Sequence, residues 1–235
     1  MAGLDGVVLV SATTAVALIT LGMWGPMEGG GVPMGKAFGW HPVLMTLAFP
    51  CLMVLGRWMY LVDESFCSGK ASRRTAHRAV MIAATFVMLA GYLCIFLAHW
   101  PNRQFLGWDF KSGERKEWRR VLHVWLGYAV MAVALAQAAM GIMKMKSLQL
   151  GQRSFTFHGD LGKPIIAMGV INVLVATWFW AWGAGMKLAV LIACSACGVF
   201  GAYWPKQVTA RSEAESAEAQ RIGGGMEMRD NEALD

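Results

Sequence analysis

Trp40-His41-Pro42-Val43-Leu44-Met45 opens an apolar run that continues to Leu55 and carries one histidine at its start. Three further histidines, His77, His123 and His158, also stand close to the beginning of an apolar run. An ionisable side chain within an apolar span is energetically costly and usually has a function. One such histidine is as often incidental as functional, but four in equivalent places indicate a shared role.

The composition indicates a membrane protein. The 235 residues are 56% hydrophobic and 15% charged, with a mean hydropathy of +0.45, whereas a soluble domain averages about a quarter charged residues. The apolar residues form runs of about 20, which is the length that crosses a hydrocarbon core roughly 30 Å thick. We therefore expect a polytopic, all-α protein in a lipid bilayer, without a cleavable signal peptide and without a nucleic-acid partner.

Six apolar runs predict six transmembrane helices, and Pro50 should kink the second because it lacks a backbone donor. The runs cover approximately residues 4–24, 40–62, 75–100, 120–143, 155–182 and 184–204. We expect residues 1–205 to form one transmembrane domain and the polar residues 206–235 to form a disordered cytoplasmic tail. Cys194 and Cys197 form a CxxC within the last run, where packing is favoured over redox chemistry.

Basic residues near the span ends predict the orientation. The side that holds both termini carries eleven such residues and the other side carries eight. Because Lys and Arg accumulate on the cytoplasmic side, we expect both termini in the cytoplasm. The host membrane stays open among vesicular, vacuolar or lysosomal, endoplasmic reticulum and plasma membranes.

The four histidines should form two pairs. Successive spans enter the bilayer from alternate sides, so His41 and His123 lie shallow on the outer side, and His77 and His158 lie shallow on the inner side. The two members of each pair come from parallel, next-but-one helices that can face each other across a bundle.

Two imidazoles at one depth suit a haem iron better than zinc. Zinc usually takes four protein ligands, and no Asp or Glu lies deep in these runs. A haem iron needs two axial ligands, and filling both favours one-electron transfer over oxygen activation. We therefore expect helices two to five to form a bundle around two haems. Two alternatives stay open, a histidine-based transition-metal or proton transporter and a structural bundle with incidental histidines.

The motifs resemble those of the eukaryotic cytochrome b561 family of transmembrane, ascorbate-dependent oxidoreductases. Trp40-His41-Pro42 resembles the family's helix-start HP motif. Leu122-His123-Val124-Trp125 with Gly127 resembles its LH-x-W-x-G motif, in which Ser is usual where Val124 stands. His158 with Gly162 resembles its H-x-x-x-G motif. The resemblance covers about residues 36–204, and the WHPVLM wording is similar to that of the shorter, stand-alone branch.

The resemblance implies two b-type haems, with His41 and His123 as iron ligands on the non-cytoplasmic side and His77 and His158 on the cytoplasmic side. It implies electron transport from cytoplasmic ascorbate to monodehydroascorbate or a ferric chelate across the membrane, which is ferrireductase or monodehydroascorbate reductase activity. Homodimers are common in the family, so a second copy is a possible partner.

Basic residues beside the pairs are candidates for binding anions, although positive-inside topology alone explains each inner one equally well. Haem propionates require basic or polar partners, and the candidates are Arg119 and Arg120 on the outer side and Arg78 and Lys163 on the inner side. Ascorbate is a monoanion at neutral pH, and its candidate partners at the inner surface are Lys70, Arg73, Arg74, Arg153 and Tyr60.

Two positions depart from the family pattern. The family carries a donor-binding lysine about five residues before the third-helix histidine, where Ser72 stands here. Many members end the second helix with a Tyr-Arg pair, whereas Leu61 follows Tyr60 in this chain. His99, at the outer end of the third run, corresponds to a family histidine that lines the acceptor site. An interfacial histidine without a role is the alternative for His99.

Overall fold

The computed structural model describes residues 2–60, 69–152 and 154–202, with side chains from residue 5 to residue 200 apart from the gaps. The chain divides into two units, Met1–Ala202 and Tyr203–Asp235. The second unit holds the expected tail, 206–235, and lies outside the described residues.

The first unit consists of helices and one small sheet. Helices are α1 (Ala2–Trp24), α2 (Ala37–Thr46), the π-helical η1 (Leu47–Met53), α3 (Val54–Trp58), α4 (Gly69–His99), the 3-10 helix η2 (Trp100–Asn102), α5 (Trp118–Gln149), α6 (His158–Phe179) and α7 (Ala184–Ala202). The strands are β1 (Gln104–Phe105), β2 (Trp108–Asp109) and β3 (Glu114–Arg115), which pair antiparallel in that order.

Five helical segments are long and apolar enough to cross a membrane: Asp5–Trp24, Ala37–Trp58, Gly69–Asn102, Trp118–Gln149 and His158–Phe179. They correspond to the first five expected runs, and α7 corresponds to the sixth but is a shorter apolar helix. The expected boundaries of the third run, 75–100, were wrong at the start. The basic residues before the run continue the helix because nothing between Gly69 and Thr75 breaks it.

Pro50 changes the second span locally instead of ending it. The residues around it form a π-helical turn, so α2, η1 and α3 continue as one span from Ala37 to Trp58. A proline lacks the N–H that an α-helical turn needs, and a single wider turn is a common way to accommodate that loss. The structure therefore shows a π-helical segment at Pro50, and the kink stays a prediction.

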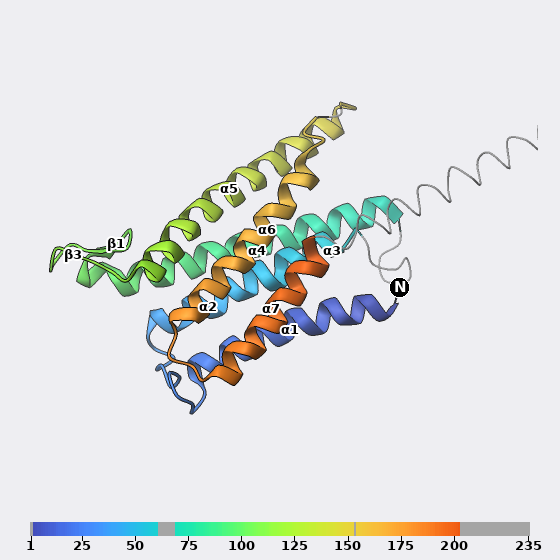
Figure 1. The fold of residues 1–235 in the computed structure, drawn as a ribbon. Coiled ribbons are helices and arrows are strands. Elements are labelled where there is room, and N and C mark those ends of the chain that lie inside the picture. Colours follow the sequence, from blue (N-terminus) through green and yellow to red (C-terminus); the bar gives the residue numbers. More distant parts are fainter. Residues whose placement is uncertain (1, 61–68, 153, 203–235) are drawn as a thin grey trace, which may run out of the picture. The chain divides into compact units, whose positions relative to one another are not determined.

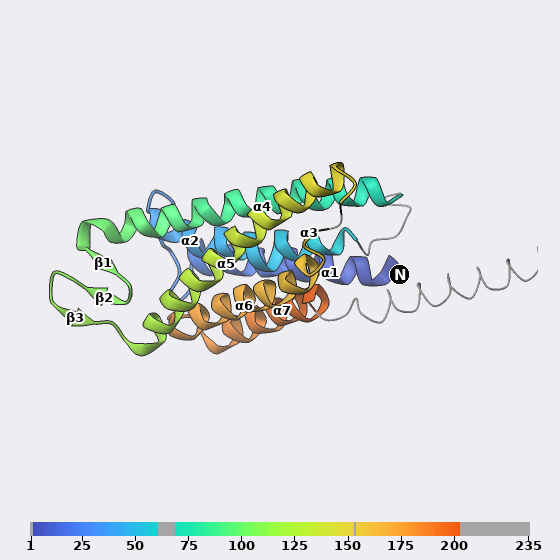
Figure 2. The same ribbon diagram turned by 90° about the horizontal axis from the view of Figure 1, so that it is seen from above.

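The helices lie side by side, and the long connections lie at their ends (Figures 1 and 2). The small sheet, the start of α2 and the start of α5 lie at one end of the bundle, which we call the sheet end. The N-terminus, α3 and the start of α4 lie at the opposite end. In both views the starts of α2 and α5 are therefore separated from the starts of α4 and α6 by the length of the bundle.

Two antiparallel helix pairs form the centre of the fold. The second span packs along α4, and α5 packs along α6, while α7 packs against both α1 and α6. Near the end of α1, the buried indole of Trp182, which comes just before α7, donates to the Gly22 carbonyl over 2.9 Å. Cys194 and Cys197 of α7 are buried as free thiols, so the CxxC packs as expected.

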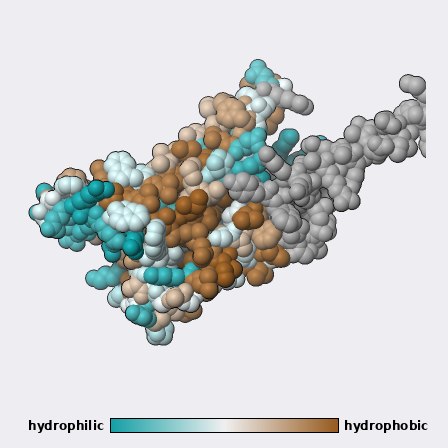
Figure 3. Space-filling view, viewed as in Figure 1, coloured by the Kyte–Doolittle hydropathy of each residue, from teal (hydrophilic) through white to brown (hydrophobic). Residues whose placement is uncertain are grey.

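Apolar side chains cover the outside of the helices. Figure 3 shows hydrophobic residues over the middle of the bundle and hydrophilic residues around the sheet end. Large apolar residues such as Phe86 on α4 and Ile192 on α7 are 70% and 62% exposed. A soluble protein rarely exposes such a surface, whereas lipid tails solvate it readily.

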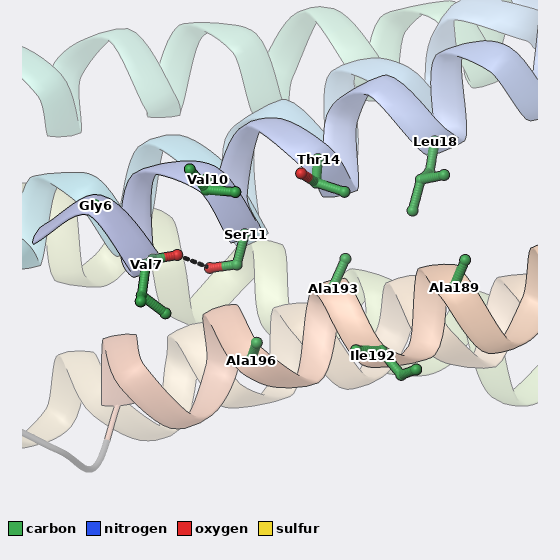
Figure 4. Close-up of a pocket in the computed structure, with 10 residues that line it drawn as sticks. All are labelled: Gly6, Val7, Val10, Ser11, Thr14, Leu18, Ala189, Ile192, Ala193 and Ala196. Carbon is green, nitrogen blue, oxygen red and sulfur yellow. Dashed lines mark hydrogen bonds between the residues drawn. The ribbon is translucent and has the colours of Figure 1, made fainter. Parts of the chain in front are cut away.

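One groove of about 710 Å³ runs between α1 and α7 on this apolar surface (Figure 4). Its lining consists of small and apolar residues together with two hydroxyl residues: Gly6, Val7, Val10, Ser11, Thr14, Leu18, Ala189, Ile192, Ala193 and Ala196. The Ser11 hydroxyl donates to the Val7 carbonyl of its own helix over 2.8 Å. The lining therefore offers contact area and little polar chemistry.

Gly169 of α6 should be intolerant of any side chain. A Cβ at this position would overlap the ring of Phe49 in η1, whereas a Cβ at Gly198 of α7 meets only Val170 at 3.5 Å, which is ordinary contact. Overpacking of a core costs about 1–3 kcal/mol. We expect Gly169→Ala to lower the thermal midpoint of the detergent-solubilised protein and Gly198→Ala to leave it unchanged or raise it. Equal midpoints for the two variants would contradict this packing.

Candidate functional site

The four histidines lie in two pairs, one near each end of the bundle. The ring centroids of His41 and His123 are 6.2 Å apart at an interplanar angle of 83°. Those of His77 and His158 are 6.5 Å apart at 87°. The residues that the structure describes contain no group of three or more His, Cys, Asp or Glu side chains able to hold a metal ion. Each pair therefore offers two imidazoles and no third ligand of that kind.

Backbone carbonyls orient three of the four rings. The Nδ1–H of His41 donates to the Gly91 carbonyl at 3.0 Å, that of His77 donates to the Gly56 carbonyl at 2.7 Å, and that of His123 donates to the Asn172 carbonyl at 3.1 Å. A carbonyl oxygen only accepts, so Nδ1 must carry the proton in each ring. Nε2 is then the nitrogen with the free lone pair.

His158 is oriented through its backbone instead. The Gln137 amide of α5 donates to the His158 carbonyl at 2.5 Å. The Nδ1 atom of His158 is buried and has no hydrogen-bond partner among the described residues. Gly141 of α5 gives this ring its space, since a Cβ there would lie 3.2 Å from the His158 Cε1 atom.

The two pairs have the donor chemistry and spacing that a bis-histidine haem requires. Metal-ligating histidines usually donate their other ring N–H to a carbonyl or carboxylate, as His41, His77 and His123 do. An iron bonded to one nitrogen of each ring through bonds of about 2 Å places the two ring centres about 6 Å apart. The observed separations of 6.2 and 6.5 Å match that distance.

Of the two basic residues expected near the His41–His123 pair, Arg120 shares a contact with it. The Arg120 guanidinium lies over the Phe179 ring at 5.3 Å, and the same ring lies edge-on to His123 at 5.6 Å. Arg119 lies over the Trp178 ring at 4.9 Å and 3.2 Å from the Glu117 carboxylate. Arg120 is therefore the nearer of the two arginines to the ring system of the pair.

The two basic residues expected near the His77–His158 pair have different partners. Arg78 reaches across to α5, where it contacts the Met145 sulfur at 2.8 Å. Lys163 is 2.6 Å from the Asp160 carboxylate on its own helix. Its charge is therefore matched locally and does not depend on an anion at the histidine pair.

Several residues expected at the donor surface meet beside His77. The Tyr60 ring lies 4.9 Å from the His77 ring, and Arg73 donates to the Tyr60 carbonyl at 3.1 Å. Arg74 is close enough to Tyr60 to interact with it electrostatically. Lys70 is exposed in the first turn of α4, and Arg153 lies outside the described residues.

The structure adds Lys144 to the inner pair. Lys144 lies three residues after Gly141 on α5 and interacts electrostatically with both His77 and His158. In the sequence it counts only as one basic residue near a span end, because nothing local distinguishes it from Lys146. Only the packing of α5 against α4 and α6 brings Lys144 to the two histidines.

His99 ends α4 at the sheet end. Its Nδ1 atom is 3.3 Å from the Gln104 side-chain oxygen, and its ring lies edge-on to Phe38 at 6.3 Å. It also interacts electrostatically with His41. His99 is therefore beside the outer pair without belonging to it.

The fold and the paired histidines define a multi-pass helical membrane protein with two pairs of neighbouring imidazoles. The family model of eukaryotic cytochrome b561 matches residues 40–179, which include all four paired histidines. The chain therefore belongs to the eukaryotic cytochrome b561 family, as the motifs predicted. A comparison with curated protein sequences finds no match. Membership of this family establishes a transmembrane oxidoreductase that transfers electrons by way of haem b.

Gly141 should be required for haem binding beside His158. A valine at this position forces its side chain into the His158 ring, and overpacking of that kind costs about 1–3 kcal/mol. A Cβ at Gly159, next to His158 in sequence, would meet no other atom within 4 Å. We expect Gly141→Val to reduce the haem content of the purified protein and Gly159→Ala to preserve it, as measured by the reduced-minus-oxidised absorption spectrum. Full haem content in Gly141→Val would contradict the placement of His158.

Proposed function

We propose that this protein carries single electrons from cytoplasmic ascorbate to monodehydroascorbate or a ferric chelate on the other side of the membrane. In this proposal, His77 and His158 hold one haem b group, and His41 and His123 hold the other. The observation that carries it is the presence of two imidazole pairs with metal-ligand spacing near opposite ends of one bundle. When bound, the haems would supply one-electron centres, and the four imidazoles would hold them.

The protein's own contribution is to fix the rings in place. A hydrogen bond to a carbonyl raises the basicity of the opposite nitrogen and holds the ring plane. His41, His77 and His123 have such a bond. Arg120 on the outer side and Lys144 on the inner side are the cations that we assign to the haem carboxylates.

The donor surface is assigned to the start of α4 and the end of the second span. Tyr60 and Arg73 are hydrogen-bonded to each other beside His77, and Arg74 and Lys70 are exposed on the same helix start. Ascorbate must lose one electron and one proton to become monodehydroascorbate. Cations at this surface bind the monoanion, and its proton can pass directly to water.

The proposed topology has six spans. α7 adds a sixth to the five segments that meet the length requirement, since it packs against α1 and α6 as a helix of 19 residues. An even number places both ends of the 1–205 domain on one side, and the basic residues favour the cytoplasm for that side. The sheet end, with His99, then faces the acceptor.

A histidine-based metal transporter is less well supported. Transition-metal sites in proteins take three or more ligands from His, Cys and carboxylates, and the described residues contain no such cluster. Three of the four rings also donate from Nδ1 to helix carbonyls. A ring fixed in this way suits a stationary ligand better than a proton relay.

The proposal is tested with purified protein in liposomes that contain ascorbate, with ferricyanide or ferric citrate outside. We expect the external acceptor to be reduced at a rate that depends on internal ascorbate. The haem spectrum should show oxidation and re-reduction during turnover. Reduction at the same rate in protein-free liposomes, or no reduction by haem-loaded protein in either orientation, would contradict the proposal.

The histidine pairing makes a sharper prediction. His41→Ala and His123→Ala should each remove the same haem, and the double variant should lose no more than either single variant. His77→Ala and His158→Ala should behave in the same way for the other haem. Haem content and redox titration measure this. Additive losses within a pair would show that its two members bind different groups.

The donor surface predicts a change in affinity and not in haem content. Charge-assisted contacts contribute about 1.5–3 kcal/mol each, so Lys70→Ala combined with Arg74→Ala should raise the KM for ascorbate roughly a hundredfold or more. Lys111→Ala in the connection at the sheet end is the matched control, which should leave this KM unchanged. An equal effect of both changes would place the donor site elsewhere.

A further inference from the structure

A chain of four polar side chains leads from the small sheet to His99. Lys116 donates to the Asp109 Oδ2 atom at 3.0 Å, and the Gln104 amide donates to the same oxygen at 2.8 Å. The Gln104 oxygen in turn is 3.3 Å from the His99 Nδ1 atom. Gln104 and Asp109 are direct partners in the β1–β2 register, so the sheet itself aligns the middle of the chain.

The turn between β2 and β3 fixes the orientation of the Asp109 carboxylate. The Oδ1 atom of Asp109 accepts from the backbone N–H groups of Lys111 and Ser112. The hydrogen bond from Lys116 is the main reason that the pKa of Asp109 lies well below its ordinary range. This group therefore stays a carboxylate at neutral pH and can only accept hydrogen bonds.

That charge sets the direction of every bond in the chain. Because Asp109 only accepts, Gln104 must turn its NH2 group toward Asp109 and its oxygen toward His99. The Gln104 oxygen also only accepts, so His99 must donate from Nδ1. The neutral His99 ring is then fixed as the Nδ1–H form, which leaves Nε2 with the free lone pair.

The surroundings of His99 match a binding position for an acceptor. His99, at the end of α4, lies beside Phe38 of α2. The Phe38 ring stacks on Trp180 at 5.5 Å with an interplanar angle of 16°. The charged and titratable groups that interact with it are His41 of the second span, Lys116 and Arg120. The position thus combines a flat apolar wall, positive charge and one directed nitrogen.

We propose that Gln104 and Asp109 are positioning residues that hold His99 as the Nδ1–H form, so that Nε2 accepts a hydrogen bond from a hydroxyl-bearing anionic acceptor. This inference rests on the proposed function, because it places the acceptor at the sheet end. An acceptor with hydroxyl groups, such as monodehydroascorbate, gains this bond, whereas a purely inorganic anion without donors does not.

The form of His99 is tested directly by NMR of histidine-labelled protein with its haems in place. The ring nitrogens of His99 are assigned by their loss in His99→Gln. We expect the natural protein to show one neutral form with the proton on Nδ1. Asp109→Asn keeps an oxygen that can accept from the backbone N–H groups of Lys111 and Ser112. The introduced side-chain amide and that of Gln104 can then both flip, so this variant should show a mixture of the Nδ1–H and Nε2–H forms of His99. Glu114→Gln, on β3 of the same sheet, should resemble the natural protein.

The role of His99 in acceptor binding is tested by measuring electron delivery to two external acceptors, monodehydroascorbate and ferricyanide. Loss of one directed hydrogen bond should raise the KM for monodehydroascorbate roughly 5–10-fold in Asp109→Asn and in Gln104→Leu, with little change in kcat or haem content. The KM for ferricyanide, which has no donor group, should be unchanged in both variants.

The outcomes separate the two proposals. A proton on Nε2 in the natural protein, or an unaltered form in Asp109→Asn, overturns the inference whatever the activity. A fixed Nδ1–H form with an unchanged KM for monodehydroascorbate overturns the role at the acceptor. Absence of ascorbate-driven reduction by the haem-loaded natural protein contradicts the proposed function, while the NMR result still decides the form of His99.

Discussion

The hydrogen bond from a ring N–H to a backbone carbonyl of a neighbouring helix is the interaction on which this structure depends. His41 of the second span donates to Gly91 of α4, and His77 of α4 donates to Gly56 of the second span. The two bonds join one antiparallel helix pair near both ends. In an apolar medium an unpaired N–H is costly, so the bonds fix helix register and ring orientation together. The orientation of the paired rings is thus a consequence of helix packing.

The second helix pair repeats the first with one exception. The His41 and His123 rings donate to carbonyls 50 and 49 residues later in the chain. The His77 ring and the His158 backbone carbonyl each contact a residue 21 positions earlier. In the second pair, however, Gln137 binds the His158 backbone, and the His158 ring nitrogen is left without a partner among the described residues. The His41–His123 pair is therefore held by two ring hydrogen bonds and the His77–His158 pair by one, so the two pairs are held unequally.

The local sequence predicted the class of protein and its family. Apolar runs predicted the membrane helices because a span must satisfy its backbone internally, and the alternation of sides predicted which histidines pair. The small sheet was not predicted, since three two-residue strands leave no periodicity to read. The start of α4 was also missed, because charged residues can continue a helix beyond the bilayer. The roles of Lys144 and Gln104 depend on contacts between elements and have no local signal.

The sequence by itself determined that this chain has helices of membrane-spanning length, approximately where they lie, and that its four histidines form two pairs. These properties follow from hydropathy and order along the chain, which are one-dimensional. Only the tertiary structure decided which ring nitrogen His41, His77 and His123 present, which cations lie beside each pair, and how Asp109 sets the direction of bonds reaching His99. Those properties depend on atoms from different helices or strands meeting within about 3 Å, and no pattern within a single segment specifies such meetings.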